Sequence, residues 1–425
     1  MQALIVVIII LAAVILFITE KIPLALTGIG VIIALILTGI LTAKEAFAGF
    51  SNETTLLILF MAPIGEALFK TGVGEYIGDK MIRIAKNNEK KIVLSIMLCG
   101  LVLSSISSNT GTFLALMPLV LGIGVASGIP AGRLLIPLAF STSFGGILTL
   151  IGTAPNIMIN AAAKAYGVKT FGFFEFGKVG IFVAVSCTIY MILLGIKQLP
   201  KTNFKNCELS NNNNIKSNMN NGKNKKWISM LIMCIIIISM TMIDYIEAAT
   251  GLTLPAIAVI GAMLVVITGC INMKEFFDSV NWTAVMLFAA LIPLGTAMTK
   301  TGAAELIAGK IVNYMPLHNK YVLISVLFLI AGTLAQFMSH TAATAILSPV
   351  FFSISVKTGV NPQALLMTLA ISTGIAVATP IGTPPNVIAY SNCDYKFTDF
   401  IKTGIPVFFI SWIISVIFIP IFFPL

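Results

Sequence analysis

The chain has 425 residues, of which 58% are hydrophobic and only 10% charged, and its mean hydropathy of +1.01 excludes an ordinary soluble domain. About 20 apolar residues suffice to cross the roughly 30 Å hydrocarbon layer of a membrane, and this chain contains many such runs, so it is predicted to be an all-α polytopic membrane protein. The net charge of +10 is concentrated in the lysine- and asparagine-rich segment 197–226, which predicts a solvated linker and no nucleic-acid surface.

Apolar segments before this linker predict the first set of membrane helices. The first of them lacks the basic start and the small-residue cleavage site of a signal peptide, so it is predicted to be a retained helix. One closely spaced pair either crosses the membrane twice or enters and leaves on one side as a re-entrant hairpin. The predicted segments are 2–19, 23–42, 54–69, the pair 92–107 with 111–127, 134–163 and 178–196.

The same succession returns after the linker. At a shift of about 230 residues the two halves share many identities, for example Thr38-Gly39 with Thr268-Gly269 and Lys70-Thr71-Gly72 with Lys300-Thr301-Gly302. This register indicates a duplication, with a first repeat at 1–196, the linker at 197–226 and a second repeat at 227–425. The predicted segments of the second half are 227–246, 252–271, 283–299, the pair 321–338 with 341–356, 362–390 and 403–424.

The number of crossings predicts how the two repeats are oriented. The helical pair adds an even number of crossings, so each repeat, with about five transmembrane helices plus a re-entrant hairpin, crosses an odd number of times. The repeats should then have inverted topology, as in many secondary transporters. With the linker in the cytoplasm, most basic residues lie on that side, as the positive-inside rule requires. Both termini are then expected outside the cell (inner or plasma) membrane.

A short polar motif occurs at the tip of each helical pair: Ser108-Asn109-Thr110 and Ser339-His340-Thr341. One helix ends there and presents free carbonyl groups, while the next begins there with free N–H groups and the positive end of its dipole. A cation and an anion could therefore bind at one tip, each at its preferred helix end. The alternative is that these residues merely cap helices, but repetition in both halves favours a binding site.

Each tip motif is followed by a second repeated motif that should interrupt a helix. The two copies are Ile151-Gly152-Thr153-Ala154-Pro155-Asn156 and Ile381-Gly382-Thr383-Pro384-Pro385-Asn386. Proline removes a backbone donor and disfavours helix in the residue before it, and glycine permits close backbone approach. The segments from Thr149 to Pro155 and from Thr379 to Pro385 are predicted to be unwound. A proline kink alone would not require the same pattern twice, so the paired interruptions predict a transporter site.

These motifs resemble those of the divalent anion/sodium symporters, the INDY-like dicarboxylate transporters of the ion transporter superfamily. The resemblance covers nearly the whole chain and is most specific in the Ser108-Asn109-Thr110 tip and in the stretch 378–386. It implies a homodimer in which a substrate-carrying domain moves as an elevator against a scaffold. It also implies that the two tips hold the substrate carboxylates and help to bind sodium ions.

The resemblance assigns roles to individual residues. Substrate contacts are expected from Ser108, Asn109, Thr110, Ser339, His340, Thr341, Thr379 and Pro380. The first sodium site is expected to involve Ser104, Ser108 and Asn109, and the second the backbone around Ala335, Met338 and Ala378.

His340 departs from the family pattern, which has a second asparagine there, and this puts the second sodium site in doubt. A lone membrane histidine is often only a packing residue, but its place inside a binding motif favours a functional role. Neutral imidazole could donate to a carboxylate, and protonated imidazole could supply the charge otherwise brought by sodium. We therefore predict that His340 makes transport pH-sensitive. Glu66, the one acid well inside an apolar span, is predicted to pair with Lys70 outside the site.

These features predict a secondary transporter for a small dianion, such as succinate, malate or fumarate, coupled to sodium ions. The site contains no lysine or arginine, so cations bound with the substrate must offset its charge. Citrate, sulfate or another oxyanion, and sodium-independent exchange, remain alternatives. A polytopic membrane enzyme is a weaker alternative, because no HExxH, Gly-x-Ser-x-Gly or Walker-type motif is present.

Overall fold

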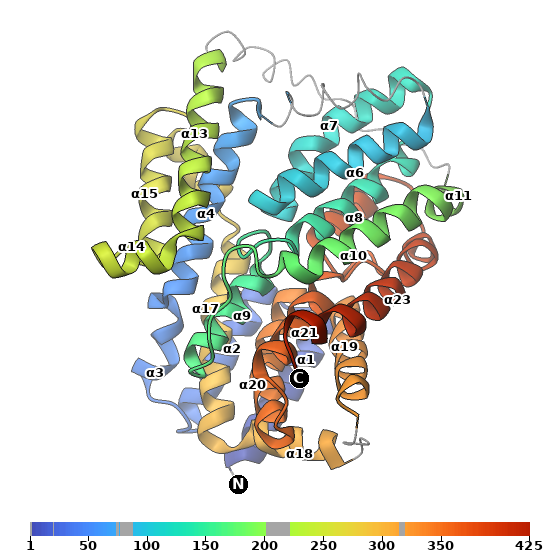
Figure 1. The fold of residues 1–425 in the computed structure, drawn as a ribbon. Coiled ribbons are helices and arrows are strands. Elements are labelled where there is room, and N and C mark those ends of the chain that lie inside the picture. Colours follow the sequence, from blue (N-terminus) through green and yellow to red (C-terminus); the bar gives the residue numbers. More distant parts are fainter. Residues whose placement is uncertain (1, 20, 74–75, 77–87, 201–221, 314–318) are drawn as a thin grey trace.

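The computed structural model describes the chain except for residues 1, 20, 74–75, 77–87, 201–221 and 314–318. All the regular elements of the described part are helices (Figure 1). Within these residues, seven helical stretches are long and apolar enough to cross a membrane, and three shorter apolar helices add to them. The prediction of an all-α fold is therefore confirmed.

The described part of the first half contains three helical stretches of membrane-spanning length, a helical pair and an interrupted helix. Its elements are α1 (Gln2–Thr19), α2 (Leu24–Leu37), α3 (Ala43–Phe47), η1 (Ala48–Ser51), α4 (Glu53–Lys70), α6 (Glu89–Ile106), α7 (Asn109–Ser127), η2 (Ala131–Arg133), α8 (Leu135–Gly146), α9 (Ala154–Ala165), α10 (Gly177–Tyr190), η3 (Met191–Gly195) and α11 (Ile196–Gln198).

The second half repeats this order, with the additional short helix α14. Most of the predicted linker lies outside the described residues, and α13 begins within its last part. The elements are α13 (Gly222–Thr241), α14 (Ile243–Thr250), α15 (Leu254–Ile267), α16 (Met273–Ser279), α17 (Trp282–Thr301), α18 (Ala303–Asn313), α19 (Lys320–Phe337), α20 (His340–Thr358), α21 (Pro362–Gly374), α22 (Pro384–Asn392) and α23 (Phe397–Phe422).

Several of the repeated glycines are helix stops. Gly39 follows α2 with a φ of 68°, Gly269 follows α15 with a φ of 67°, and Gly302 follows α17 with a φ of 74°. Residues with a Cβ rarely adopt this left-handed conformation, so glycine is the usual residue just after a helix. Helix α2 therefore ends at Leu37, before the predicted limit at residue 42. The repeated pairs Thr38-Gly39 and Thr268-Gly269 lie directly after α2 and α15.

The two halves pack against each other reciprocally. Helix α2 of the first half packs against α17 of the second, and α15, the counterpart of α2, packs against α4, the counterpart of α17. Glycines allow the close approach: a Cβ on Gly28 of α2 would lie 2.9 Å from the Cβ of Ala290, and one on Gly261 of α15 would lie 2.9 Å from Ile64. Small residues at helix interfaces are typical of membrane proteins. This reciprocal packing is what a two-fold relation between the halves produces.

Ion pairs follow the same reciprocal pattern. Lys70 on α4 lies 3.6 Å from Glu275 on α16, and Lys300 on α17 lies 3.0 Å from Glu45 on α3. Glu45 and Glu275 each complete a capping box at the start of their short helix. Lys70 therefore pairs across the repeat boundary with Glu275, and not, as the sequence predicted, with Glu66 on its own helix.

The helical pairs and the interrupted helices form the other part of the molecule. The pair α6–α7 lies with α8 and α10 in the upper right of Figure 1, and α19–α20 lies in its lower part. The first arm of each pair packs within its own half, α6 on α8 and α19 on α21. The second arm also packs within its own half, α7 on α8 and α20 on α21, and in addition reaches the other half, where α7 contacts α22 and α20 contacts α9. Stacked rings of Tyr166 and Phe352, with centroids 4.2 Å apart, mark the α9–α20 contact.

The unwound segments differ from the predicted ones at both ends. The first runs from 147 to 153 and the second from 375 to 383, so both begin before Thr149 and Thr379. Pro155, Pro384 and Pro385 lie inside the first turn of α9 and α22 instead of in the unwound segments. The reason is that proline fits the first helical turn, where its missing N–H would have no intrahelical partner.

Candidate functional site

The first tip is a two-residue turn between α6 and α7. Helix α6 ends at Ile106, Ser107 and Ser108 are extended, and α7 begins at Asn109. The hydroxyl of Ser108 accepts a hydrogen bond from the Gly111 N–H at 3.1 Å and so caps α7. Capping therefore accounts for part of the Ser108 chemistry, while its side chain remains exposed.

Oxygen atoms converge on the amide of Asn109. Ser104 Oγ lies 2.7 Å from Asn109 Oδ1 and 2.8 Å from the carbonyl oxygen of Thr142. If the amide is rotated, Nδ2 takes the place of Oδ1 and donates to the carbonyls of Gly152 at 3.1 Å and Thr142 at 3.0 Å. The rotated orientation satisfies both amide atoms, so Nδ2 and not Oδ1 is the atom that faces these two carbonyl oxygens. We call Ser104, Asn109 and the carbonyls of Thr142 and Gly152 the oxygen cluster.

The first unwound segment is held by its own polar side chains. Thr149 Oγ1 donates to the Ser105 carbonyl of α6 and accepts from the Gly152 N–H at 3.1 Å. Asn156 Nδ2 donates to the carbonyls of Gly146 at 3.1 Å and Thr149 at 2.8 Å. These bonds satisfy backbone groups that the interrupted helix leaves without helical partners.

The second unwound segment uses the same bonds. Thr379 Oγ1 donates to the Gln336 carbonyl of α19 and accepts from the Gly382 N–H at 3.2 Å. Asn386 Nδ2 donates to the Thr379 carbonyl at 2.9 Å. A Cβ on Gly382 would lie 2.3 Å from the Ala376 carbonyl oxygen, so only glycine fits there, and Gly152 is constrained in the same way by Gly146.

The second tip differs from the first in its polar groups. Met338 and Ser339 are extended, α20 begins at His340, and Ser339 makes no side-chain capping bond. His340 is buried, and its Nδ1 lies 3.3 Å from the carbonyl oxygen of Gly382. Its backbone carbonyl accepts from Thr344 Oγ1, which also lies 2.9 Å from the Thr373 hydroxyl.

Gln336 is a functional candidate that the sequence reasoning missed. Its Nε2 donates to the carbonyls of Gly332 and Ile375, both at 3.1 Å, and its Oε1 accepts from the Ala378 N–H at 2.8 Å. The side chain thus ties α19 to the second unwound segment. Its only signal in the sequence is that an amide interrupts the apolar end of α19, at the position that Ser105 has in the first half.

The predicted substrate residues differ in their exposure. Ser108 is exposed, Thr110 and Ser339 are half-buried, and Asn109, His340, Thr341, Thr379 and Pro380 are buried. The Thr379 hydroxyl already has two partners, whereas the Ser339 hydroxyl has no capping partner. Thr153 and Thr383 are extended residues just before α9 and α22, and neither side chain caps its helix.

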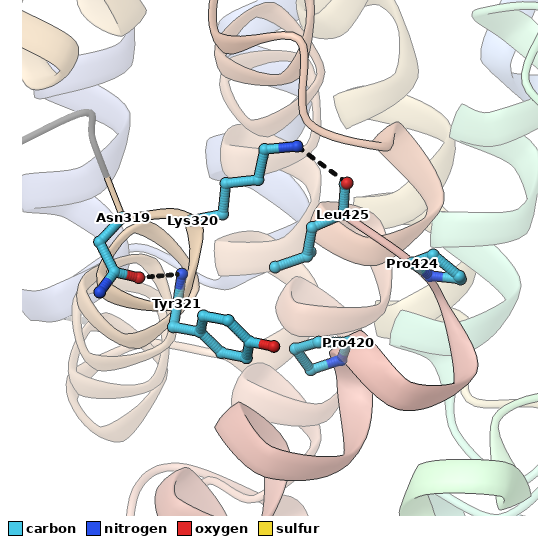
Figure 2. A pocket seen from close by; sticks show the side chains of 6 residues that line it. All are labelled: Asn319, Lys320, Tyr321, Pro420, Pro424 and Leu425. Atoms are coloured by element: carbon cyan, nitrogen blue, oxygen red, sulfur yellow. Dashed lines mark hydrogen bonds between the residues drawn. The ribbon is translucent and has the colours of Figure 1, made fainter.

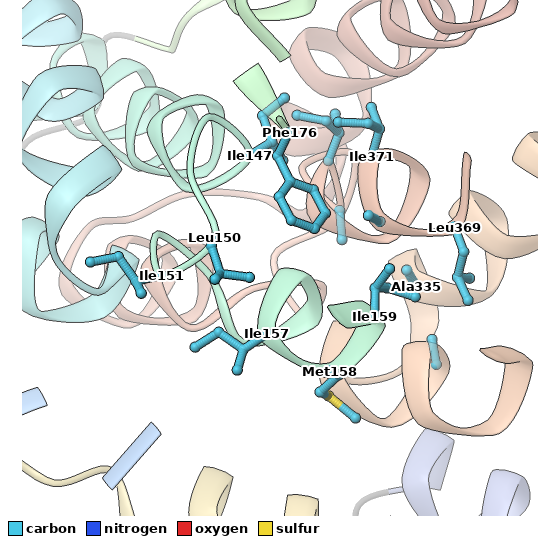
Figure 3. Close-up of a cluster of buried hydrophobic side chains, with 14 of the residues drawn as sticks. Ile147, Leu150, Ile151, Ile157, Met158, Ile159, Phe176, Ala335, Leu369 and Ile371 are labelled. Carbon is cyan, nitrogen blue, oxygen red and sulfur yellow. The ribbon is translucent and has the colours of Figure 1, made fainter. Parts of the chain in front are cut away.

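The residues predicted for the two sodium sites also lie in different surroundings. Ser104 and Asn109 belong to the oxygen cluster, but Ser108 Oγ serves as the α7 cap. Ala335 is fully buried, and Figure 3 shows it beside apolar side chains of α9 and α21, such as Ile159 and Leu369. Met338 is also buried, and the Ala378 N–H is bonded to Gln336.

The tips and unwound segments can bind ions of both signs. Four helices, α7, α9, α20 and α22, begin at these motifs and direct the positive ends of their dipoles toward them. Pro155, Pro384 and Pro385 have no N–H group, so α9 and α22 offer fewer backbone donors than α7 and α20. The oxygen cluster offers neutral oxygen ligands, and the two asparagine oxygens Asn156 Oδ1 and Asn386 Oδ1 are buried without a hydrogen-bond partner. Neither the tip motifs nor the residues 147–153 and 375–383 include a lysine, arginine, aspartate or glutamate.

A pocket of about 450 Å³ lies elsewhere, between the start of α19 and the end of α23 (Figure 2). Lys320 Nζ bonds to the Leu425 carbonyl at 2.9 Å beside it. Asn361 Nδ2 bonds to the Pro424 carbonyl, also at 2.9 Å. These contacts fasten the last residues to the helix ends, and none of the predicted site residues lines this pocket.

Paired helical tips beside paired interrupted helices, in an all-helical chain with long apolar helices, define a polytopic membrane transporter. The chain belongs to the CitMHS family, described as citrate transporter, whose model matches residues 14–355 and 250–424. This confirms the resemblance to anion transporters of this superfamily, and the assignment is to a transporter and not to an enzyme.

Relatives and a solved structure agree with this family. An uncharacterized transporter of Methanocaldococcus jannaschii is 27% identical over 91% of this chain and 86% of its own length. The sodium-dependent dicarboxylate transporter SdcS of Staphylococcus aureus is 22% identical over 94% of this chain and 82% of its own. The YdaH transporter of Alcanivorax borkumensis has a similar fold, with a TM-score of 0.61 at 14% identity over 89% of this chain and 87% of that one.

Proposed function

We propose that this protein is a sodium-coupled secondary transporter of a small dianion, most suitably a C4-dicarboxylate such as succinate, malate or fumarate. The observation that carries the proposal is the pair of uncharged tips, each placed beside an interrupted helix. The helix N-termini and the free hydroxyls of Ser339 and Thr110 bind the carboxylates. Because the site brings no positive side chain of its own, a cation must bind with the dianion.

The oxygen cluster suits a sodium ion. Its four groups are hydroxyl, amide and carbonyl oxygens, the neutral hard ligands that alkali and alkaline-earth cations prefer. Without a cation, Asn109 Nδ2 donates to the carbonyls of Thr142 and Gly152. Rotation of the amide would turn Oδ1 toward a bound cation in place of this donor. Asn109 thereby links cation occupancy to the geometry of the first tip.

We expect the protein to move as two parts, which correspond to two groups of helices that pack together. The reciprocal unit of α2, α4, α15 and α17 serves as the scaffold, and the tips with the interrupted helices move against it as an elevator in a homodimer. The two inverted repeats, 1–196 and 227–425, place the tips on opposite sides of the substrate. The linker lies in the cytoplasm and the termini outside the cell membrane, in accord with the distribution of lysine and arginine.

Uptake by the purified protein in lipid vesicles tests the proposal. Radiolabelled succinate should accumulate with an inward sodium gradient and fail to accumulate when choline replaces sodium. Citrate is the second candidate substrate because the family is described by it, and sulfate serves as a further competitor. Equal uptake in sodium and choline would instead establish a sodium-independent exchanger.

A variant of Asn109 tests the cation site itself. Asn109→Leu keeps the side-chain size but removes the amide, so sodium-dependent uptake should fall by about tenfold or more, as expected for loss of a bound group worth about 1.4 kcal/mol. Ser105→Ala, which changes a neighbouring hydroxyl bonded only to the Val102 carbonyl of its own helix, is the matched control and should retain uptake. Unchanged sodium dependence in Asn109→Leu would contradict the assignment.

A further inference from the structure

We infer that the second tip binds no cation, because the imidazole of His340 occupies the position that the Asn109 amide has at the first tip, and that transport is coupled to one sodium ion only. This inference rests on the proposed function and gives its ion stoichiometry. It follows from comparing the two copies of the motif within this chain.

The two tips place different side chains, each through a nitrogen atom, against equivalent carbonyls. At the first tip the Asn109 amide faces the carbonyl of Gly152 at 3.1 Å. At the second, Nδ1 of His340 lies 3.3 Å from the carbonyl of Gly382, the residue that repeats Gly152. An amide can turn either its oxygen or its nitrogen toward this position, whereas an imidazole offers only nitrogen there. With Nδ1–H donating, the Gly382 carbonyl is no longer free to bind a cation.

The second tip also lacks the hydroxyl that completes the oxygen cluster. Ala335 stands where the first half has Ser104 and is fully buried in apolar surroundings (Figure 3). Its methyl group supplies no ligand. Two of the four groups of the first cluster are therefore replaced by groups that cannot bind sodium.

Neighbouring charges do not compensate for this loss. The elements that contact α20 are α9, α17, α18, α19 and α21, and α21 carries no titratable residue. Lys164 of α9 pairs with Glu53, Lys300 of α17 with Glu45, and Lys320 of α19 bonds to Leu425. On α20 itself, Lys357 bonds to the Glu305 carbonyl of α18. Glu305, in the first turn of α18, and Lys310 belong to a helix that contacts Lys357 in the last turn of α20, away from the second tip.

The sodium stoichiometry of the wild-type protein tests the inference directly. Vesicles containing the protein are given a tenfold inward sodium gradient, with equal pH on both sides and the membrane potential held at zero. The probe is radiolabelled succinate, or citrate if succinate is not transported. One coupled sodium ion gives about tenfold accumulation at equilibrium and two give about hundredfold, since each ion contributes the free energy of its own gradient.

A variant designed to create a sodium site at the second tip provides a second test, which does not depend on the wild-type accumulation ratio alone. Ala335→Ser combined with His340→Asn rebuilds the groups of the first tip, and its accumulation should rise toward about hundredfold. Ala331→Ser combined with His340→Asn is the matched control, because it adds the same hydroxyl one turn earlier on α19. This control should stay near about tenfold.

The outcomes separate this inference from the proposed function. Accumulation of about tenfold by the wild-type protein supports the inference, and a rise confined to the rebuilt variant strengthens it. Accumulation of about hundredfold by the wild type overturns the inference while leaving sodium-coupled transport intact. If neither succinate nor citrate is accumulated in response to sodium, the proposed function itself fails and the inference fails with it.

Discussion

The hydroxyl of Thr379 donates to the backbone carbonyl of Gln336, and so the second unwound segment is bonded to the end of α19 just before the tip. Thr149 makes the same bond to Ser105 in the first half. In both copies the threonine also accepts from the N–H of the glycine three residues later. A tip and its neighbouring interruption are thus one hydrogen-bonded unit, which has to be displaced together.

Thr379→Val is expected to uncouple this unit at the second tip. Valine has nearly the same shape but leaves the Gln336 carbonyl and the Gly382 N–H without this partner, at a cost of about 1–3 kcal/mol. The melting temperature of the purified protein should fall and uptake should be strongly reduced. Thr379→Ser keeps the hydroxyl and should restore both properties. A valine variant with normal uptake would show that the bond is not needed.

Gln336→Met tests the residue that the sequence did not reveal. Methionine fills a similar volume but leaves the Ala378 N–H and the Ile375 carbonyl without their side-chain partner. Each buried unpaired group costs about 1–3 kcal/mol, so thermal stability and uptake should both fall. Gln336→Glu retains an acceptor for Ala378, but its second oxygen would face the carbonyls of Gly332 and Ile375 in place of a donor, so it should be no more stable than the methionine variant. Wild-type stability and uptake in either variant would contradict a role of this amide.

Gly382→Ala is expected to disrupt the second unwound segment by steric overlap. The added Cβ would lie 2.3 Å from the Ala376 carbonyl oxygen, a backbone atom that cannot move away freely. Overpacking of this kind costs about 1–3 kcal/mol. Gly295→Ala in α17 is the control, since a Cβ there meets no atom within 4 Å. Measured by thermal unfolding in detergent, the first variant should lose stability and the second should not.

His340→Asn is expected to reduce the pH dependence of uptake. His340 is the one titratable side chain in the second tip motif, and its protonation would bring a positive charge to a motif that otherwise has none. The ratio of wild-type to variant uptake should therefore change with pH, because titration of the substrate affects both proteins equally. A constant ratio, with uptake intact in the variant, would exclude this role of His340.

The duplicated motifs made much of the site predictable. The shift of about 230 residues correctly identified the helical pairs and the interrupted helices, because glycine, proline and short polar residues impose local backbone behaviour wherever they occur. The short helices α3 and α16 and the exact limits of the unwound segments were not predicted. Their ends depend on capping bonds and on proline in the first turn, which the hydrophobic pattern does not report.

Other features depend on contacts between distant segments. The nearby sequence predicts neither the Lys70–Glu275 ion pair nor the contact of α20 with α9, because each joins residues from different halves of the chain. The end of α19 packs against the second unwound segment. This contact brings the Thr379 hydroxyl to the Gln336 carbonyl and the Gln336 amide to the Ala378 N–H.

The sequence by itself determined that this is a polytopic membrane protein built from two related halves, with two polar tips and two interrupted helices. It determined this because hydrophobic length and helix-breaking residues act locally. The sequence also shows that the tips differ, with Asn109 in one and His340 in the other. Only the tertiary structure decided which groups each of these side chains faces. Asn109 faces an oxygen cluster and His340 faces a single carbonyl, and that difference arises where segments about 40 residues apart in the chain are packed together, which residue patterns alone do not specify.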